Sequence, residues 1–543
     1  MGGMIVAPQP EAVEAGALAL KRGGNAVDAA IAAAFMQGVV DPQMAGIGGF
    51  GSMQVYMPAR GVHEILEFYA RASLSATPEM WTDRLVGQSG DGFAFLLKDN
   101  ASEIGYLAAC TPGSVKGYAA ALTRYGTFDW VDVIAPAAAE ARRGFTVRPH
   151  VHWFWTQDQS GSGQANTIDK LRFSKTGREI YFRTDGAVKR PGDVVVNTDM
   201  ADTLELLARR GPEDFYRGEI AGRIADDMAA NGGLISRADL AAYELSVVPP
   251  LWGDYRGLKI ATSPPPGSGL SMLQVLHILG HFDVGALEHG AAEHIILLAE
   301  AMKRMTIDKD AHMGDPAYVD VPVERLLSAA HCGEVASRIK AGERAVVTRL
   351  GDKSARDTTH ISVVDDAGNA VALTHTLGSP SGAITDGLGF MYNGTMSRFD
   401  PRPGRAGSIA PGKRRSSSAA PTIVFRDEQP YLVIGAPGGS YIAPSVAQGL
   451  MNVIDFGMSM REAVAAPRIA AVSNIIEVSN RIPRTVTDAV AARGYEVKRS
   501  WQSYAFAALH GIRIQGGRRE GGADPQRDGM ALDVADGTLE ARA

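Results

Sequence analysis

The spacing of apolar residues predicts helices through most of the first part of the chain. Apolar positions recur with a helical period over 11–23, and Asn25 is placed to cap an alanine-rich helix over 26–40. Short runs bounded by turn signals predict strands at 51–56 and 63–68. Further helical patterns cover residues 114–143, 201–231 and 291–313.

The pattern changes after Thr358, where short strands alternate with turns rich in Gly, Asn and Asp. Helices are predicted around 444–454 and 459–465, and strands at 361–364, 370–376, 421–425 and 431–434. Strands flanked by helices on both sides indicate an α/β protein in which helical layers cover stacked sheets.

Length, composition and charge narrow the class of protein. The 543 residues contain no low-complexity run, repeat or block of like charge, which favours one intertwined unit. Charged residues make up 21% and the net charge is -6, so a small polar ligand fits better than nucleic acid or a membrane surface. Asp28 and Gln37 interrupt the longest apolar stretch, as in a buried helix. The context of Cys110 and Cys332 favours buried free thiols over a disulfide.

The remaining motifs predict neither a cofactor nor a metal. No basic region precedes an apolar core at the N-terminus, so we expect a cytoplasmic protein. The glycines of 46–51 lack the strand–helix pairing of a dinucleotide-binding loop and favour a packing role. His150 and His152 flank three aromatic residues and are predicted to form an aromatic cluster on a loop, since metal-ligand spacing is absent.

A candidate nucleophile stands at the head of the strand predicted at 361–364. A threonine hydroxyl is a poor nucleophile unless a base lies beside it. Cutting the chain between Asp357 and Thr358 would create an α-amino group, with a pKa near ~7.7–8.0, that can serve as this base. The segment is therefore a candidate for self-processing and catalysis, the alternative being an ordinary strand entry.

Several segments resemble the γ-glutamyltranspeptidase family of N-terminal-nucleophile hydrolases in order and spacing. They are 374–377, 415–424 and 435–440 after the threonine, and 23–30, 46–49, 111–115, 255–257, 264–269 and 314–316 before it. The resemblance implies a four-layer αββα sandwich. It also implies a precursor cut into a large chain, 1–357, and a small chain, 358–543, which form one intertwined heterodimer; a dimer of heterodimers is left open.

The resemblance also implies the catalytic roles. Thr358 would attack the carbonyl carbon of Asp357 during processing and an amide of the substrate afterwards. Thr376 matches the threonine that hydrogen-bonds the nucleophile. Gly438 and Gly439 match the backbone N–H donors of the oxyanion hole, where glycine lets a carbonyl approach the main chain closely.

The chain departs from the transpeptidases where they bind glutamate. The arginine that clamps the α-carboxylate is replaced in the segment 68–70, with Arg71 nearby. Aligned through Asn393, the positions that hold the α-ammonium become Gly378, Thr395 and Arg398. The substrate-binding residues that the resemblance implies are therefore Tyr69, Arg71, Asn393, Thr395, Arg398, Ser417 and Ser418.

Arg398 takes the place of an acidic residue. A substrate ammonium ~4 Å from it would be repelled by up to ~4 kcal/mol at an effective dielectric constant near 20. A carboxylate would instead be attracted and could be held bidentately. The segment 399–413 is short and rich in Pro and Gly, without the family's tyrosine-bearing lid, and an open site admits bulkier amides and water.

These features favour an amidohydrolase whose small amide substrate carries a carboxylate on its acyl part, as in oxamate hydrolases and glutaryl-cephalosporin acylases. The alternative is a γ-glutamyltransferase or glutathione hydrolase that recognises the glutamyl group of its substrate through Arg71 and Arg398. A non-catalytic binding protein is a third class. The retention of Thr358, Thr376 and the glycine pair argues against it, because a scaffold needs no nucleophile.

Overall fold

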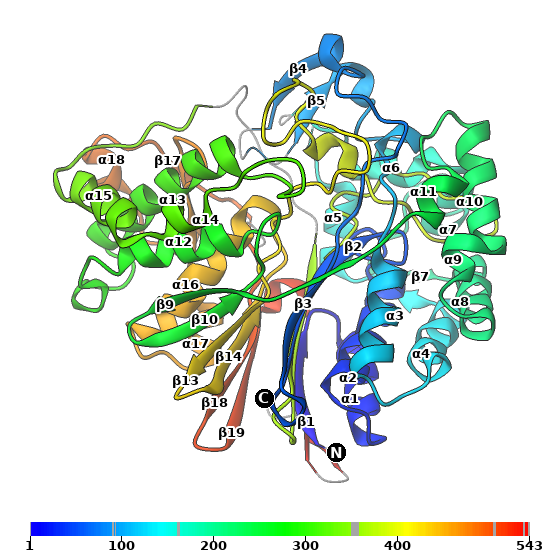
Figure 1. Cartoon of the computed structure of the whole chain (residues 1–543), viewed down its shortest axis with the longest axis horizontal. Coiled ribbons are helices and arrows are strands. Elements are labelled where there is room, and N and C mark those ends of the chain that lie inside the picture. The colour runs from blue at the N-terminus through cyan, green and yellow to red at the C-terminus, as the bar shows by residue number, and fades with distance from the viewer. Residues whose placement is uncertain are drawn as a thin grey trace.

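Two β-sheets form the centre of the protein, with helices on either side of them (Figure 1). The computed structural model describes residues 2–89, 92, 94–159, 163–348, 358–502, 506–535 and 538–540. Together, the sheets and helices confirm the predicted α/β class.

The larger sheet has eight strands. Their order is β21 (Thr538–Glu540), β20 (Met530–Ala535), β1 (Gly3–Ala7), β11 (Thr359–Asp365), β12 (Ala370–Thr376), β2 (Phe50–Met57), β3 (Val62–Phe68) and β8 (Ser246–Val248). The smaller sheet has six, in the order β19 (Arg518–Ala523), β18 (His510–Gln515), β14 (Gln429–Gly435), β13 (Thr422–Arg426), β10 (Leu258–Thr262) and β9 (Leu251–Tyr255). Every pairing within these two sheets is antiparallel.

The inner strands of both sheets, such as β11, β12, β13 and β14, are buried over most of their length, so they carry apolar side chains on both faces. In β11, Ile361 and Val363 pack into the core shared with one set of helices, whereas Val364 packs between the sheets. In β14, Leu432 packs toward the other helices and Val433 between the sheets. Successive side chains of a strand point to opposite faces, so each strand contributes to two cores.

One set of helices covers the outer face of the larger sheet. Its central member, α2 (Ala26–Val40), has the predicted bounds, because Asn25 and Asp28 form a capping box at its start. All fifteen of its residues are buried. The other main helices that contribute to this core are α1 (Pro10–Lys21), α3 (Ser114–Tyr125), α4 (Trp130–Arg143), α8 (Thr198–Arg210) and α10 (Glu219–Ala230).

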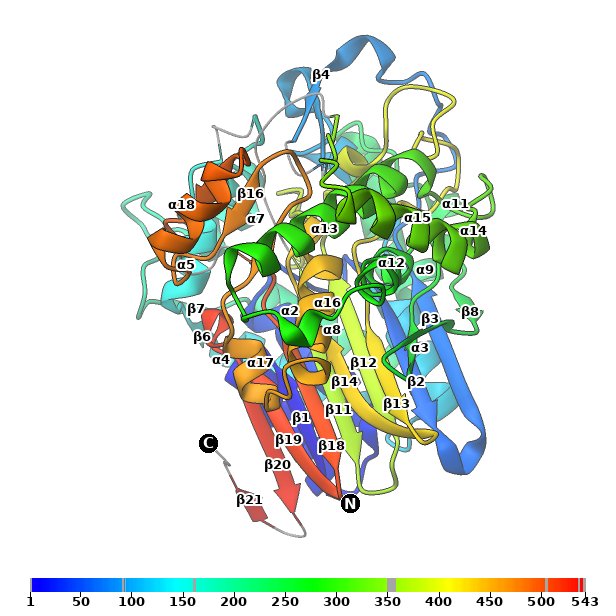
Figure 2. The same ribbon diagram turned by 90° about the vertical axis from the view of Figure 1, so that its left-hand side faces the viewer.

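A second set of helices covers the outer face of the smaller sheet, and it lies in front of that sheet in Figure 2. It comprises α12 (Gly269–Leu279), α13 (Ala292–His312), α15 (Ala329–Lys340), α16 (Ile442–Ile454), α17 (Met460–Ala465) and α18 (Arg484–Ala492). No helix in the described ranges is long and apolar enough to span a membrane.

Some predictions of local structure were wrong. His150 and His152 lie on a helix, α5 (Pro149–Thr156), and not on a loop. Proline at its first position fixes the backbone for helix entry, and burial of Phe154 and Trp155 stabilises it. The helical character predicted for 201–231 is confirmed, in the form of three helices, with α9 (Asp214–Arg217) between α8 and α10. The two cysteines are buried and free, as predicted.

Candidate active site

The two predicted catalytic threonines lie opposite each other at one end of the larger sheet. Strand β11 pairs with β12 so that Thr359 is opposite His375. Extending this antiparallel register by one pair sets Thr358 opposite Thr376. Both side chains are buried, at 5% and 6% exposure. The hydroxyl of Thr376 also accepts a hydrogen bond from the Gly378 N–H, at 2.7 Å.

The space between the sheets becomes polar next to these threonines. His360 Nδ1 lies 2.8 Å from the Thr374 hydroxyl, and Nε2 lies 3.1 Å from the Ser362 hydroxyl. These side chains alternate with the apolar ones that face the helices, so Thr358 belongs to the face of β11 that meets the smaller sheet. A Cβ added at Gly435 would collide with the His360 ring.

The glycine pair, Gly438 and Gly439, comes three residues after Gly435 in the chain. Strand β14 ends at Gly435, and the next residues lead to Gly438 and Gly439 at the same edge of the sheets. Gly438 has φ 145°, and a Cβ there would collide with the Cα and Cβ atoms of Ala507. Gly439, with φ 56°, opens the turn that leads into α16. Free N–H groups at a helix start favour negative charge, as an oxyanion hole requires.

Sequence reasoning did not find Arg527, which holds the main chain at Thr358. Its Nη1 donates to the Thr358 carbonyl at 2.9 Å, and its Nη2 lies 2.6 Å from a carboxylate oxygen of Asp41. Asp41 also accepts hydrogen bonds from Gln9 and Gln43. The sequence offers no signal for this arrangement, because Arg527 is 169 residues from the threonine and belongs to no motif.

The buried histidines behind the site predict acid-sensitive stability. Burial lowers the pKa of His360 and of His375 to about 3. The unfolded chain therefore binds more protons than the folded chain between pH 6.5 and 3, so the free energy of unfolding falls with falling pH. The slope is up to ~1.4 kcal/mol per pH unit for each histidine. We expect a falling thermal midpoint below pH 6.5, measured by circular dichroism.

A His360→Asn variant isolates one of these histidines, since carboxylates also contribute to acid unfolding. Asparagine can keep the hydrogen bond to Thr374 but cannot take up the proton. Between pH 7 and 5 the variant should lose less stability than the wild type. An equal loss in both proteins would show that His360 does not contribute.

A cavity of about 420 Å³ opens next to the glycine turn. Ser440, which follows Gly439, and the predicted pair Ser417 and Ser418 line it, whereas Thr358 is not in its lining. Its charged lining, among the described residues, comprises the basic Lys309, Arg398, Arg402, Arg405 and Arg415 and the acidic Asp310 and Asp400. Five positive charges against two make the cavity electropositive.

The three positions that correspond to the family's ammonium site, Gly378, Thr395 and Arg398, lie close together. The Nη2 of Arg398 donates to the Gly378 carbonyl at 2.7 Å, and a Cβ on Gly378 would be 2.6 Å from Thr395 Cγ2. Of this group, Arg398 lines the cavity, and Thr395 lies behind it, fully buried, with its hydroxyl bonded to Asn393. The amide of Asn393 also bonds the main chain of Gly48 and Cys110, so it holds the wall in place.

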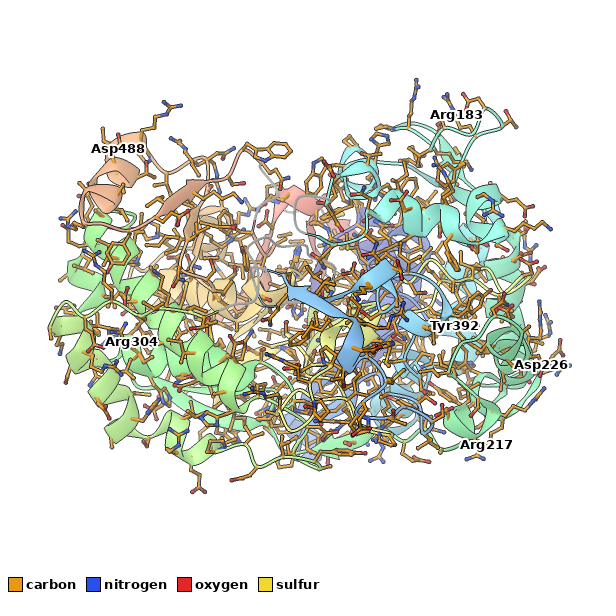
Figure 3. The ribbon with its side chains drawn as sticks, turned by 90° about the horizontal axis from the view of Figure 1, so that it is seen from above. Arg183, Arg217, Asp226, Arg304, Tyr392 and Asp488 are labelled. Carbon is orange, nitrogen blue, oxygen red and sulfur yellow. The ribbon has the colours of Figure 1, made fainter. Side chains whose placement is uncertain are left out.

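The region around Asn393 is interior. From above, the neighbouring Tyr392 lies inside the molecule, whereas Asp226 and Asp488 lie at opposite edges (Figure 3). Both Tyr392 and Asn393 are fully buried.

Tyr69 and Arg71 are not brought to the cavity. Tyr69 is fully buried, and its carbonyl accepts a hydrogen bond from the Tyr243 hydroxyl. Arg71 donates to the carbonyls of Glu244 and Gly412 instead of lining the cavity. Asp357 lies outside the described residues.

Comparison with known proteins agrees with this geometry. The sequence model described as Gamma-glutamyltranspeptidase matches residues 12–534. The Acylase ACY 1 proenzyme of Pseudomonas sp. (strain V22) is 38% identical over 505 residues, covering 92% of this chain and 88% of that protein. The Glutathione hydrolase proenzyme of Bacillus subtilis (strain 168) is 32% identical over 555 residues, covering 98% and 91%.

Among solved structures, the cephalosporin acylase from Bacillus halodurans matches with a TM-score of 0.84. It is 27% identical, and the match covers 98% of this chain and 95% of that one. Taken together, these similarities show that the chain belongs to the gamma-glutamyltranspeptidase family. It is a hydrolase of this family that acts on amide bonds.

Proposed function

We propose that the protein is a self-processing amidohydrolase in which Thr358 becomes the N-terminal nucleophile. The observation that carries the proposal is the register that pairs Thr358 with Thr376 beside the glycine turn. The two relatives described above are both named as proenzymes. In this interpretation the fold is the four-layer αββα sandwich of N-terminal-nucleophile hydrolases.

Processing would proceed by an N-to-O acyl shift. The Thr358 hydroxyl adds to the carbonyl carbon of Asp357, the peptide C–N bond breaks as the nitrogen takes up a proton, and an ester forms. Water hydrolyses the ester, which leaves a carboxylate on Asp357 and a free α-amino group on Thr358. The products are chains 1–357 and 358–543.

The two chains would stay together after the cut because they share both sheets. In the larger sheet, β1 from the first chain lies between β20 and β11 from the second. In the smaller sheet, β10 from the first chain pairs with β13 from the second. Separating them would break two sheets and expose their cores, so the mature enzyme is an intertwined heterodimer.

Substrate hydrolysis would use the same groups. The α-amino group takes the hydroxyl proton as the Thr358 oxygen attacks the substrate amide, and the proton then passes to the leaving amine. Water, activated by the same amine, hydrolyses the acyl ester. The N–H groups of Gly438 and Gly439 would stabilise the oxyanion in both steps, and each donor in such holes contributes about 2.7–4 kcal/mol.

The charge of the cavity favours an acyl group that carries a carboxylate, such as an oxamate-like or glutaryl-like amide. Arg398 is 7% exposed, lines the cavity, and is oriented by the Gly378 carbonyl. A γ-glutamyl substrate would bring an ammonium group toward these cations, and Arg71 does not reach the cavity to help hold its carboxylate. Glutathione hydrolysis is thus the second candidate, and the named glutathione hydrolase relative favours it.

Two anilides separate these candidates, because glutaryl-p-nitroanilide and γ-glutamyl-p-nitroanilide differ only by the ammonium. We expect the wild type to prefer the glutaryl compound in kcat/KM, measured by nitroaniline release. Arg398→Ala should lower that value by tens- to thousands-fold, since removing one partner of a desolvated charge pair costs about 2–5 kcal/mol. Chain cleavage should be unaffected. Efficient hydrolysis of the γ-glutamyl compound alone would select the second candidate.

A further inference from the structure

Arg415 is a buried cation on the wall of the cavity. Its side chain is 3% exposed and lines the same space as Arg398 and the serines. Its guanidinium carbon lies 5.1 Å from the centre of the Phe50 ring. Within the part of the chain that the structure describes, Arg415 forms no ion pair with a carboxylate, and its buried Nε has no hydrogen-bond partner.

Other buried arginines are neutralised. Arg304 pairs with Glu300, Arg468 with Asp524, and Arg527 with Asp41. Each of these carboxylates is itself buried, so the positive charge is matched inside the protein.

The adjacent Arg414 shows the difference in ion pairing most clearly. Its Nη1 lies 2.6 Å from Glu67 and its Nη2 lies 2.7 Å from Asp315. This triad accounts for Arg414 as a structural residue. Among the described residues Arg415 has no such partner, although it is one residue away and is less exposed than most of the other residues on the cavity wall.

A buried guanidinium without a counter-charge destabilises the folded protein. Its presence therefore calls for another role, such as binding an anion. Burial lowers the pKa of Arg415 to about 10, so the group stays protonated at neutral pH. Taking a charged group out of water carries a large free-energy cost, and a charge without a buried partner has no ion pair to offset that cost. Residues that oppose stability in this way gather at functional sites.

Arg415 and Arg398 are anchored at the same corner of the cavity. Phe50 lies under the Arg415 guanidinium, and its Cζ would be 3.1 Å from a Cβ on Gly378, whose carbonyl orients Arg398. Hydroxyl groups of Ser416 and Ser417 line the same wall and can donate further hydrogen bonds.

We infer that Arg415 binds the carboxylate of the substrate's acyl group, together with Arg398, and thereby selects anionic acyl groups. This inference rests on the proposed amidohydrolase function. An incoming carboxylate would supply the counter-charge that no described carboxylate gives Arg415, and a guanidinium can hold it through two parallel hydrogen bonds. The same charge would exclude an acyl group bearing an ammonium at that point.

The test compares Arg415→Met and Arg415→Lys on two substrates, glutaryl-p-nitroanilide and valeryl-p-nitroanilide, which differ at the carboxylate end. Arg415→Met should lower kcat/KM for the glutaryl compound ~30- to 1000-fold and change the valeryl value less than ~3-fold. Arg415→Lys should retain part of the preference, because lysine keeps the charge without the fork geometry. The matched control is Arg426→Met, since Arg426 lies 3.8 Å over the Tyr431 ring but is exposed at the end of β13.

Thermal unfolding with and without glutarate adds a readout that does not depend on turnover. Without ligand, Arg415→Met should melt at or above the wild-type temperature. Glutarate should raise the wild-type midpoint and leave that of the variant unchanged. A lower midpoint together with equal loss on both substrates would make Arg415 structural and overturn the inference.

The outcomes also distinguish this inference from the proposed function. If glutaryl hydrolysis depends on Arg398 but not on Arg415, the function stands and the inference fails. If the wild type ignores glutaryl-p-nitroanilide but Arg415→Met abolishes stabilisation by glutarate, the anion site stands and the proposed acyl specificity fails. Equal stabilisation of wild type and variant by glutarate overturns the inference in either case.

Discussion

A Thr358→Ala variant is expected to remain one chain of 57.5 kDa and to hydrolyse no amide. Without the hydroxyl, neither the ester that leads to cleavage nor the acyl-enzyme ester can form. The wild type should instead give two chains, which at the mean residue mass weigh roughly 38 and 20 kDa of the 57.5 kDa total. Denaturing gel electrophoresis and an amidase assay measure both effects.

The neighbouring threonine provides the control for this variant. Thr359 is also fully buried, but the alternation of side chains along β11 directs it to the opposite face of the sheet from Thr358. Thr359→Ala should therefore still split and keep turnover within a few-fold of the wild type. Cleavage of Thr358→Ala at the same bond would remove Thr358 from the processing step.

Gly438→Ala is expected to lose ~100-fold or more in kcat. The backbone at Gly438 has φ 145°, and a Cβ there would collide with Ala507, so the turn must shift. Displacing an oxyanion donor by up to ~1 Å can lower the rate ~100-fold, and losing one donor costs ~100- to 1000-fold. Gly439→Ala, at φ 56°, should also be impaired. Steady-state kinetics on the preferred anilide give the comparison.

Gly457→Ala is the matched control. Gly457 also has positive φ, 64°, but a Cβ there would meet no atom within 4 Å. This variant should lose only the ~1 kcal/mol of stability expected of a strained backbone and keep full activity. If Gly438→Ala is folded and turns over substrate like the wild type, the glycine turn is not the oxyanion hole.

Helices and strands were predicted correctly where the cap, turn and apolar pattern in the sequence match the way the element packs in the fold. Helix α2 begins after Asn25 because its cap and its apolar run coincide. Strand β1 was not predicted, because five residues near the chain start carry too little pattern, and only its pairing with β11 and β20 makes it a strand. Helix α5 was missed because an aromatic-rich octapeptide gives no clear period.

The catalytic roles inferred from the sequence stay predictions, and the structure places some of the predicted binding residues at the cavity and others away from it. Thr358, Thr376 and the glycine pair are recognisable by spacing, and the sheet register agrees with their predicted grouping. Sequence reasoning did not single out Arg415, although it lies inside one of the segments that resemble the family, because whether a carboxylate neutralises it depends on the fold. Arg71 was predicted to contact substrate, but the carbonyls of Glu244 and Gly412 bind its guanidinium.

Intact-mass analysis of the purified wild type, with N-terminal sequencing of the smaller chain, tests the central claim most directly. The account predicts a small chain that begins at Thr358 and gains the mass of the acyl group, on Thr358, when a slow anionic amide is added. An active enzyme that stays uncut, or a small chain that begins elsewhere, would contradict it.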